Sequence, residues 1–476
     1  MSAEEIRTTR RVVLSGATLA GGALTTGALI GGAPAHAAPA GTGPAFALST
    51  TGQPPDAELT AILDEVNRSR IEATVRRLAA FGTRHTLSSQ DDPVRGIGAA
   101  TNWLYEQFQL IAAASGGRLT VEKQTYIQQP ALRIPVETPI TNVIATLRGS
   151  TSPDRVYVVT GHIDSRCTDV MDAVSDAPGA DDDASGVAVA LELARVMAAR
   201  QPRATIVFAG VAGEEQNLYG SRYMAQQMKA AGVVVRGMFS NDIIGASMGD
   251  NGERDPHTVR LFVEGVPTAE TTAQANVRRA VGGENDSVSR QLGRFVRDVA
   301  QNESTGMRVR VIWRRDRYLR GSDHISFLEQ GYPAARFTEP REDFAHQHQD
   351  VRLVDGKQFG DLPEFCDFAF ITRVARVNAA ALWSLAQAPG TPTGVVIVTT
   401  RLTNDTDLIW QRGPEPDLAG YEVVWRETTE PEWTHVIPVG DVTTARVDLS
   451  KDNVFFGVRA IGRTGLRSPV AFPQPS

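Results

Sequence analysis

Hydrophobic runs of two kinds alternate through the middle of the chain. Short runs rich in β-branched residues cover residues 142–149, 155–164, 204–215 and 237–245. Between them, residues 184–201 and 219–232 carry apolar side chains at helical spacing. Strands that alternate with helices are typical of a mostly parallel sheet whose two faces are covered by helices. The pattern therefore predicts an α/β fold for this part of the chain.

Helical patterns also stand on both sides of this region. Residues 57–84 and residues 362–387 both place apolar side chains on one face of a helix. We expect one or two helices to open the folded part and one long helix to close it. The sequence thus predicts a first folded domain over residues 57–387.

The last part of the chain has a different pattern. Residues 388–394, APGTPTG, form a Pro/Gly-rich linker. Beyond it, residues 395–476 contain short β-type runs that are separated by turn residues and show no helical period. This arrangement predicts a small all-β, immunoglobulin-like sandwich.

The N-terminus has the features of an export signal. An arginine pair at Arg10 and Arg11 precedes a weakly apolar stretch, and the small-residue motif AHA ends at Ala37. These features predict a twin-arginine signal over residues 1–37, followed by a flexible lead-in over residues 38–56. A membrane anchor is the alternative, but the stretch is rich in Gly, Thr and Ala. We therefore expect a secreted protein without stable membrane insertion.

Composition narrows the classes of partner. The chain has 476 residues, 42% hydrophobic and 22% charged, with a net charge of −7, which is ordinary for globular domains. The net charge is negative, and the sequence contains no basic run and no nucleic-acid recognition motif, so nucleic acid is not an expected partner. The two cysteines, Cys167 and Cys366, are too few for a disulfide framework. They form either one disulfide or two separate thiols.

Acids and histidines follow the predicted strands at several points. They are His162 and Asp164 in GHIDS, Asp181 to Asp183 in GADDDASG, Glu214 and Glu215 in GEE, and Asp242 in SNDIIG. Carboxyl ends of parallel strands meet at one edge of a sheet, where such carboxylates would repel one another without a cation. Mixed imidazole and carboxylate ligands suit zinc. We therefore predict a pair of zinc ions between these side chains.

The same motifs resemble those of a known family. GHIDS, PGADDDASGVA, GEEQNLYGS, SNDIIG and GSDHISFLEQGYPAARFTEP occur in order and precede a late histidine. Together they resemble the secreted co-catalytic di-zinc aminopeptidases, over about residues 141–386. The resemblance implies a three-layer α/β/α zinc-peptidase sandwich that binds two Zn²⁺ per chain and hydrolyses N-terminal residues from peptides. It also implies a metal-bridged hydroxide and a glutamate general base.

The resemblance assigns a role to each motif residue. His162 would bind one zinc, Asp182 would bridge both, and Glu215 and Asp242 would each bind one. Glu214 would be the general base and later the acid, and Asp164 would orient the imidazole of His162.

The last ligand has two candidates, His346 and His348, within HQHQD. The late histidine of the family usually stands four residues before an aspartate, and Asp350 lies four after His346. We therefore expect His346 to be the ligand. The family's supporting tyrosine has no exact match, since Ala345 replaces it and Tyr318 lies one place off.

Other interpretations remain open. A carboxypeptidase or a one-zinc aminoacyl cyclase can use a related fold, and a catalytically spent binding or adhesion protein is a third possibility. Residues 395–476 resemble a fibronectin type III domain, which implies a cell-surface or polymer partner.

Overall fold

The computed structural model describes residues 52–476. The predicted export signal and most of the lead-in lie outside these residues. Within the described part, no helix has both the length and the apolar character needed to cross a membrane.

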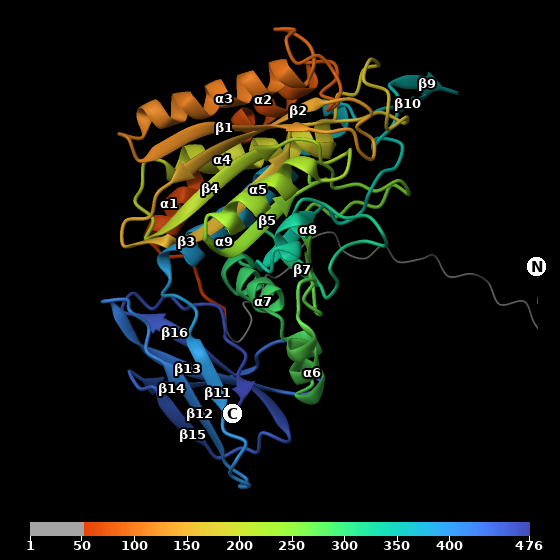
Figure 1. Cartoon of the computed structure of the whole chain (residues 1–476). Coiled ribbons are helices and arrows are strands. Elements are labelled where there is room, and N and C mark those ends of the chain that lie inside the picture. The colour runs from red at the N-terminus through yellow and green to blue at the C-terminus, as the bar shows by residue number, and fades with distance from the viewer. Residues whose placement is uncertain (1–51) are drawn as a thin grey trace, which may run out of the picture. The chain divides into compact units, whose positions relative to one another are not determined.

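An eight-stranded sheet forms the centre of the first domain (Figure 1). In spatial order its strands are β1 (Leu119–Gln128), β2 (Thr138–Leu147), β4 (Ala204–Val211), β3 (Ser152–His162), β5 (Val234–Asn241), β8 (Ala334–Thr338), β6 (Thr258–Val263) and β7 (Arg308–Ile312). The central strands β4, β3, β5 and β8 are parallel to their neighbours in that group, and β7 is parallel to β6. The pairs β1–β2, β2–β4 and β6–β8 are antiparallel. The prediction of an α/β fold with a large, mostly parallel sheet is confirmed.

Alternate residues of the central strands enter two different hydrophobic clusters. In β3, Tyr157 and Val159 pack into the larger cluster, whereas Val156 and Val158 pack into the smaller one. Since successive side chains of a strand point to opposite faces, each face of the sheet has its own core. A strand that is buried on both faces is apolar throughout, as this run is.

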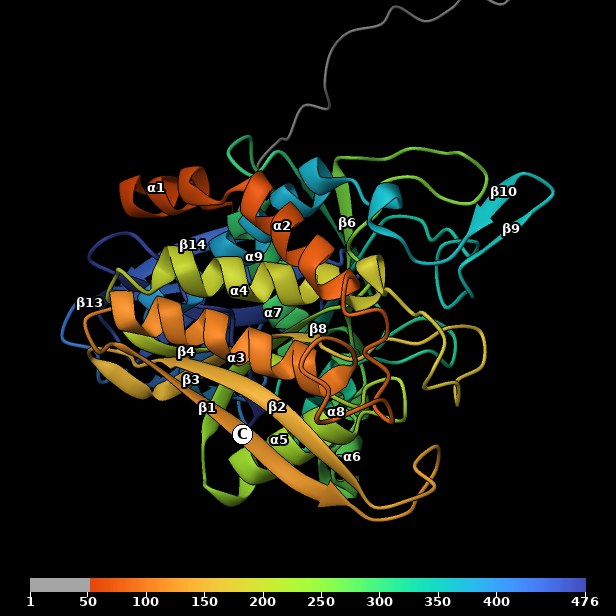
Figure 2. The same ribbon diagram turned by 90° about the horizontal axis from the view of Figure 1, so that it is seen from above.

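Helices cover both faces (Figure 2). The larger cluster includes residues of α1 (Ala57–Glu65), α2 (Arg68–Ala79), α3 (Ile97–Ala114), α4 (Ser185–Met197), α7 (Val288–Ala300) and α9 (Phe368–Gln387). The smaller cluster includes α5 (Tyr219–Ala230) and α8 (His324–Glu329). A further helix, α6 (Thr272–Ala280), has no buried residue.

Polar side chains define where several helices begin. Asp56, Asn67 and Ser287 accept hydrogen bonds from first-turn amides of α1, α2 and α7. At α9, Asp367 accepts from the amides of Ala369 and Phe370. Such caps satisfy amides that have no partner within the helix.

The C-terminal residues form two small sheets. The first contains β15 (Thr444–Val447), β12 (Thr406–Gln411), β11 (Thr393–Ile397) and β17 (Gln474–Pro475), and the second β14 (His435–Gly440), β13 (Leu418–Glu427) and β16 (Val454–Gly462). Leu408 and Trp410 of the first sheet share a hydrophobic cluster with Val423 and Phe456 of the second. Inward faces that share one core are what a sandwich requires. The fibronectin type III assignment stays a prediction.

The two cysteines are free thiols. Of the two interpretations left open by the sequence, separate thiols agree with the structure. Burial raises the pKa of Cys167 to about 11.

A buried ion-pair group joins α7 and its preceding turn to the C-terminal sheets. The Asp286 carboxylate lies 2.6 Å from Nη2 of Arg426 and 3.3 Å from Nη1 of Arg294. Gln291 donates to Asp286 and accepts a hydrogen bond from the Trp433 indole nitrogen. Their side chains are almost wholly buried. The C-terminal sheets are therefore joined to the first domain by more than the chain connection.

We expect Asp286→Ala to destabilise the whole protein. Removing one partner of a buried ion pair leaves uncompensated charge and typically costs about 3–5 kcal/mol. Here the guanidinium groups of Arg294 and Arg426 would lose their carboxylate partner. Urea denaturation should show the lower free energy of unfolding. Asp405→Ala is the control, because it breaks an exposed pair with Arg446 within the C-terminal sheets and should change stability little. Equal stability of both variants would contradict the prediction.

Candidate metal centre

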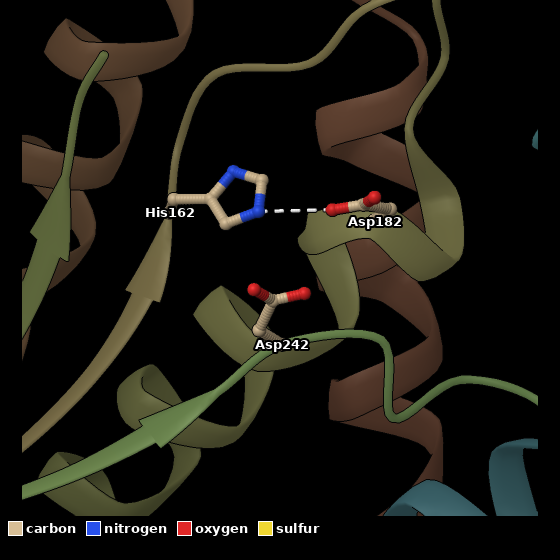
Figure 3. A group of neighbouring side chains, drawn as sticks. All are labelled: His162, Asp182 and Asp242. Atoms are coloured by element: carbon tan, nitrogen blue, oxygen red, sulfur yellow. Dashed lines mark ion pairs between the residues drawn. The ribbon is translucent and has the colours of Figure 1, made fainter. Parts of the chain in front are cut away.

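The predicted site residues meet at the carboxyl ends of adjacent strands. His162 is the last residue of β3, Asp242 directly follows β5, and Glu214 and Glu215 lie in the turn after β4. Asp182 comes from the short turn η1 (Ala180–Ala184), which precedes α4. Figure 3 shows that the side chains of His162 and Asp242 approach Asp182 from two neighbouring strands.

His162, Asp182 and Asp242 form the first group of candidate metal ligands. Nε2 of His162 lies 2.9 Å from Oδ1 of Asp182. One ligand atom from each of the three residues lies within 4.8 Å of the other two, and all three residues are buried. Three ligands at such distances can surround one cation.

Asp182, Glu215 and His348 form the second group. Nε2 of His348 lies 2.7 Å from Oδ2 of Asp182 and 2.9 Å from Oε1 of Glu215. Asp182 is thus common to both groups and turns one oxygen toward each histidine. A shared carboxylate of this kind is what two adjacent metal ions need.

Two buried polar atoms in these groups fit a metal better than a hydrogen bond. Nε2 of His162 and Oε1 of Glu215 are buried and have no hydrogen-bond partner, although an ionic partner lies within 2.9 Å of each. Buried polar atoms are seldom left unsatisfied. Imidazole nitrogen and carboxylate oxygen are also a usual ligand set for zinc. The residues therefore fit the zinc pair that the sequence predicts.

The electrostatics of the centre are strongly perturbed. Burial raises the pKa of Asp182, but His348 and His162 outweigh this and hold it well below its usual value. Burial lowers the pKa of His348, but Glu215 and Asp182 outweigh this and raise it to about 10. Burial is the main cause of the raised pKa of Glu214; His162 opposes it and Asp242 adds to it. Groups with such shifts are characteristic of functional sites.

The choice of His346 as the last ligand is corrected by the structure. Nδ1 of His346 lies 2.8 Å from Oδ2 of Asp343, and its Nε2 lies 3.1 Å from the main-chain oxygen of Gln358. Both ring nitrogens therefore face oxygen atoms outside the metal groups. His348, two residues later, reaches Asp182 and Glu215 instead.

Asp164 contacts the site in a different way from the one expected. The main-chain oxygen of Asp164 lies 3.0 Å from Nδ1 of His162, while its carboxylate is 3.7 Å from that nitrogen. The carboxylate instead accepts the main-chain amides of Glu214, at 3.2 Å, and Glu215, at 3.0 Å. Asp164 thus fixes both the imidazole and the turn that carries the two glutamates.

Asp183 links two of these elements. Its carboxylate accepts the amide of His162 at 2.8 Å and the amide of Gly186, in the first turn of α4, at 3.0 Å. This agrees with a helix-capping role. Gly161 permits the close approach, because a Cβ there would lie 2.3 Å from backbone atoms of Gly186 and Val187.

Three residues of the centre were missed by the sequence analysis. Asp361 accepts the amides of Asp181 and Asp182, and the buried Arg84 guanidinium donates to the main-chain oxygens of Pro178 and Gly179. Arg336, also fully buried, lies 2.8 Å from Oδ1 of Asp242. None is near its partner in the sequence. Arg336 does lie within the quoted GYPAARFTEP motif, which was the available signal.

The proposed supporting tyrosine is not part of these groups. Tyr318 is 80% exposed, and the guanidinium of Arg314 lies 3.8 Å from the centre of its ring. His324, in the GSDHIS part of the motif set, is buried with Nε2 2.9 Å from the main-chain oxygen of Arg315, and it belongs to neither group.

Fold and site together define an α/β protein with a candidate two-metal centre at the carboxyl ends of its parallel strands. Residues 142–355 match the model of peptidase family M28. A probable zinc metalloprotease of Pyrenophora teres f. teres is 53% identical over 426 residues, covering 89% of this chain and 88% of that protein. A probable zinc metalloprotease of Pyricularia oryzae is 55% identical, covering 89% and 86%. The chain therefore belongs to peptidase family M28.

Solved structures are more distant. The crystal structure of LapB from Legionella pneumophila is 18% identical, with a TM-score of 0.49, and the match covers 70% of this chain and 75% of LapB.

We expect Asp164→Ala to weaken metal binding. Its loss frees the amides of Glu214 and Glu215, and changes to residues that hold metal ligands typically reduce affinity about 10–100-fold. Competition with a chromophoric chelator would measure zinc affinity. Asp169→Ala is a matched control, because Asp169 is an exposed residue of the same loop. Unchanged zinc affinity in Asp164→Ala would contradict this role.

Proposed function

We propose that this protein is a secreted zinc aminopeptidase that removes N-terminal residues from peptides. The observation that carries the proposal is the position of Asp182, whose two oxygens face His162 and His348 separately. The ligand set is then His162, Asp182 and Asp242 for one ion and Asp182, Glu215 and His348 for the other. The likeness to probable zinc metalloproteases supports zinc as the metal.

Bound zinc would supply Lewis-acid activation of water and of the scissile carbonyl. Glu214 has the features of the proton carrier. It is partly exposed beside the buried groups, and its raised pKa favours a carboxyl that both accepts and returns a proton. A Glu214 carboxylate oxygen would take a proton from the attacking water and deliver it to the nitrogen of the leaving amine.

The remaining residues hold this arrangement. Asp164 keeps the amides of Glu214 and Glu215 in place, so the proton carrier and its neighbouring ligand keep a fixed relation. Arg336 lies 2.8 Å from Oδ1 of Asp242 and would hold that carboxylate in place for the metal. Removal of N-terminal residues, rather than C-terminal ones, is proposed from the motif resemblance. We also propose that the C-terminal sheets are a fibronectin type III-like module with a cell-surface or polymer partner.

Glu214→Gln tests the proton carrier. We expect the variant to bind zinc normally but to lose about 10²–10⁴-fold in kcat, which is the usual contribution of a general acid–base. Zinc per chain and single-residue release from a free peptide would be measured together. Glu253→Gln, an exposed glutamate paired with Arg341, serves as the control. A fully active Glu214→Gln would refute the role.

The direction of cleavage is tested with blocked substrates. An aminopeptidase should cleave the free peptide and leave its N-acetylated form intact. Cleavage of the acetylated peptide from its C-terminus would indicate a carboxypeptidase. Cyclisation of an N-terminal glutamine without peptide cleavage would indicate a cyclase. Binding of zinc without either reaction would favour a binding protein.

We also expect zinc to stabilise the fold. The buried carboxylates repel one another, and a ligand that binds only the folded state at 100 times its Kd adds about 2.7 kcal/mol. Removal of zinc by a chelator should therefore lower Tm, and added zinc should restore it. Asp182→Asn, which weakens both groups at once, should lose most of this response. If zinc raised the Tm of Asp182→Asn as much as that of the wild type, the shared role of Asp182 would be contradicted.

A further inference from the structure

One segment of the chain, residues 343–361, reaches Asp182 from two directions. Nε2 of His348 lies 2.7 Å from Oδ2 of Asp182. Near the end of the same segment, the Asp361 carboxylate accepts the main-chain amides of Asp181, at 2.7 Å, and of Asp182, at 2.8 Å. The 343–361 segment therefore contacts the side chain of the shared aspartate and also fixes its backbone.

Little apolar burial holds this segment in place. The side chains of Phe344, Val351, Leu353 and Val354 are between 41% and 69% exposed. The segment includes the short hairpin of β9 (Arg352–Val354) and β10 (Lys357–Phe359). Both views show this hairpin beyond the loops at one end of the large sheet (Figures 1 and 2). Its position must therefore depend on polar contacts.

The backbone conformation of His348 is a second reason why the 343–361 segment needs contacts that hold it in place. Its φ is +52°, in the left-handed region that residues with a side chain rarely adopt. Such a backbone conformation is strained, and the surroundings must offset the strain. The contacts that hold the segment must therefore also hold His348 in this conformation.

His346 makes the contacts that join the two ends of the segment. Its Nδ1 lies 2.8 Å from Asp343 and its Nε2 lies 3.1 Å from the main-chain oxygen of Gln358. The ring also stacks on Phe365, with centroids 3.4 Å apart and planes at 18°. Beside it, the Gly360 amide donates to the oxygen of Ala345. These contacts connect the start of the segment, its end and the turn that follows.

Two further ties hold the part that carries His348. Thr168 and Asp350 exchange hydrogen bonds, each main-chain amide donating to the side chain of the other residue at 3.1 Å. Arg320 donates to Oε1 of Gln347 at 3.2 Å. These hydrogen bonds join the segment to Thr168 and Arg320, which lie outside it. The contacts of His346 instead join Asp343 and Gln358, which both belong to the segment.

We propose that His346 is a positioning residue, which closes the 343–361 segment so that His348 and Asp361 reach Asp182 together. The inference rests on the proposed metal ligands. It gives His346, which lies in neither group of candidate ligands, a specific role in metal binding. A positioning histidine differs from a ligand, because its loss weakens one metal position without removing it.

The test compares three variants of the full chain. His346→Phe keeps an aromatic ring against Phe365 but loses the polar contacts of both ring nitrogens, and His348→Ala removes the candidate ligand. His435→Phe is the matched control, because His435 also stacks on an aromatic ring, that of Trp425, but lies in the C-terminal sheets. Zinc affinity is measured by competition with a chromophoric chelator. Visible absorption of the cobalt(II) form reports the ligand geometry.

We expect His346→Phe to weaken one zinc position about 10–100-fold, as is usual when a supporting contact is lost. The affinity of its other position should equal that of the single zinc retained by His348→Ala. Excess zinc should restore activity to His346→Phe but not to His348→Ala. His435→Phe should behave as the wild type.

Other results would overturn the proposal. Two zinc ions bound by His346→Phe with wild-type affinity would exclude a positioning role. Two zinc ions in His348→Ala, with one lost from His346→Phe, would make His346 the ligand. A wild-type chain that binds fewer than two zinc ions would refute the proposed function itself.

A second variant covers the case in which His346→Phe does not fold. Asp343→Ala removes the partner of Nδ1 and should weaken the same zinc position. Asp355→Asn, at the exposed tip of the β9–β10 hairpin, is its control, because Asn removes the charge and tolerates the positive φ of +50° at this position. Wild-type affinity in Asp343→Ala would likewise refute the positioning role.

Discussion

The candidate centre depends on one buried carboxylate, that of Asp182, which faces an imidazole with each of its oxygens. A carboxylate loses several kcal/mol of hydration when it is buried, so it is tolerated only with well-placed positive partners. Its partners come from distant parts of the sequence, His162 from the end of β3 and His348 from the 343–361 segment. The surrounding structure must therefore hold three separate pieces of chain in a fixed relative position.

Most of this precision comes from side chains that bind the backbone. Asp361 accepts the amide of Asp182, Asp183 accepts that of His162, and Asp164 accepts those of both glutamates. Hydrogen bonds between a charged group and a main-chain amide are among the stronger ones in proteins. The acids of the centre thus divide into candidate ligands and acids that fix the loops.

The two halves of the centre differ in their surroundings. The side chain of His162 is 1% exposed, whereas that of His348 is 29% exposed. Asp242, in the first group, shares one oxygen with the buried Arg336, and Asp316 contacts the same guanidinium at 3.3 Å. The centre is therefore closed on the side of β5 and β8, and it opens toward solvent near His348.

The sequence alone determined the class of fold and most of the candidate site. Alternating strand and helix patterns predicted the parallel core, and the order of acids and histidines along the chain predicted that they would gather at one edge of the sheet. These two inferences rest on periodicity and local order, which the sequence records directly. The choice of His162, Asp182, Glu215 and Asp242 as ligands came from the motif resemblance. The choice between His346 and His348 was decided only by the tertiary structure, because both lie in an irregular segment whose backbone direction no period fixes. The contacts of Asp361, Arg84 and Arg336 were likewise decided only in three dimensions, since each joins residues that are distant along the chain.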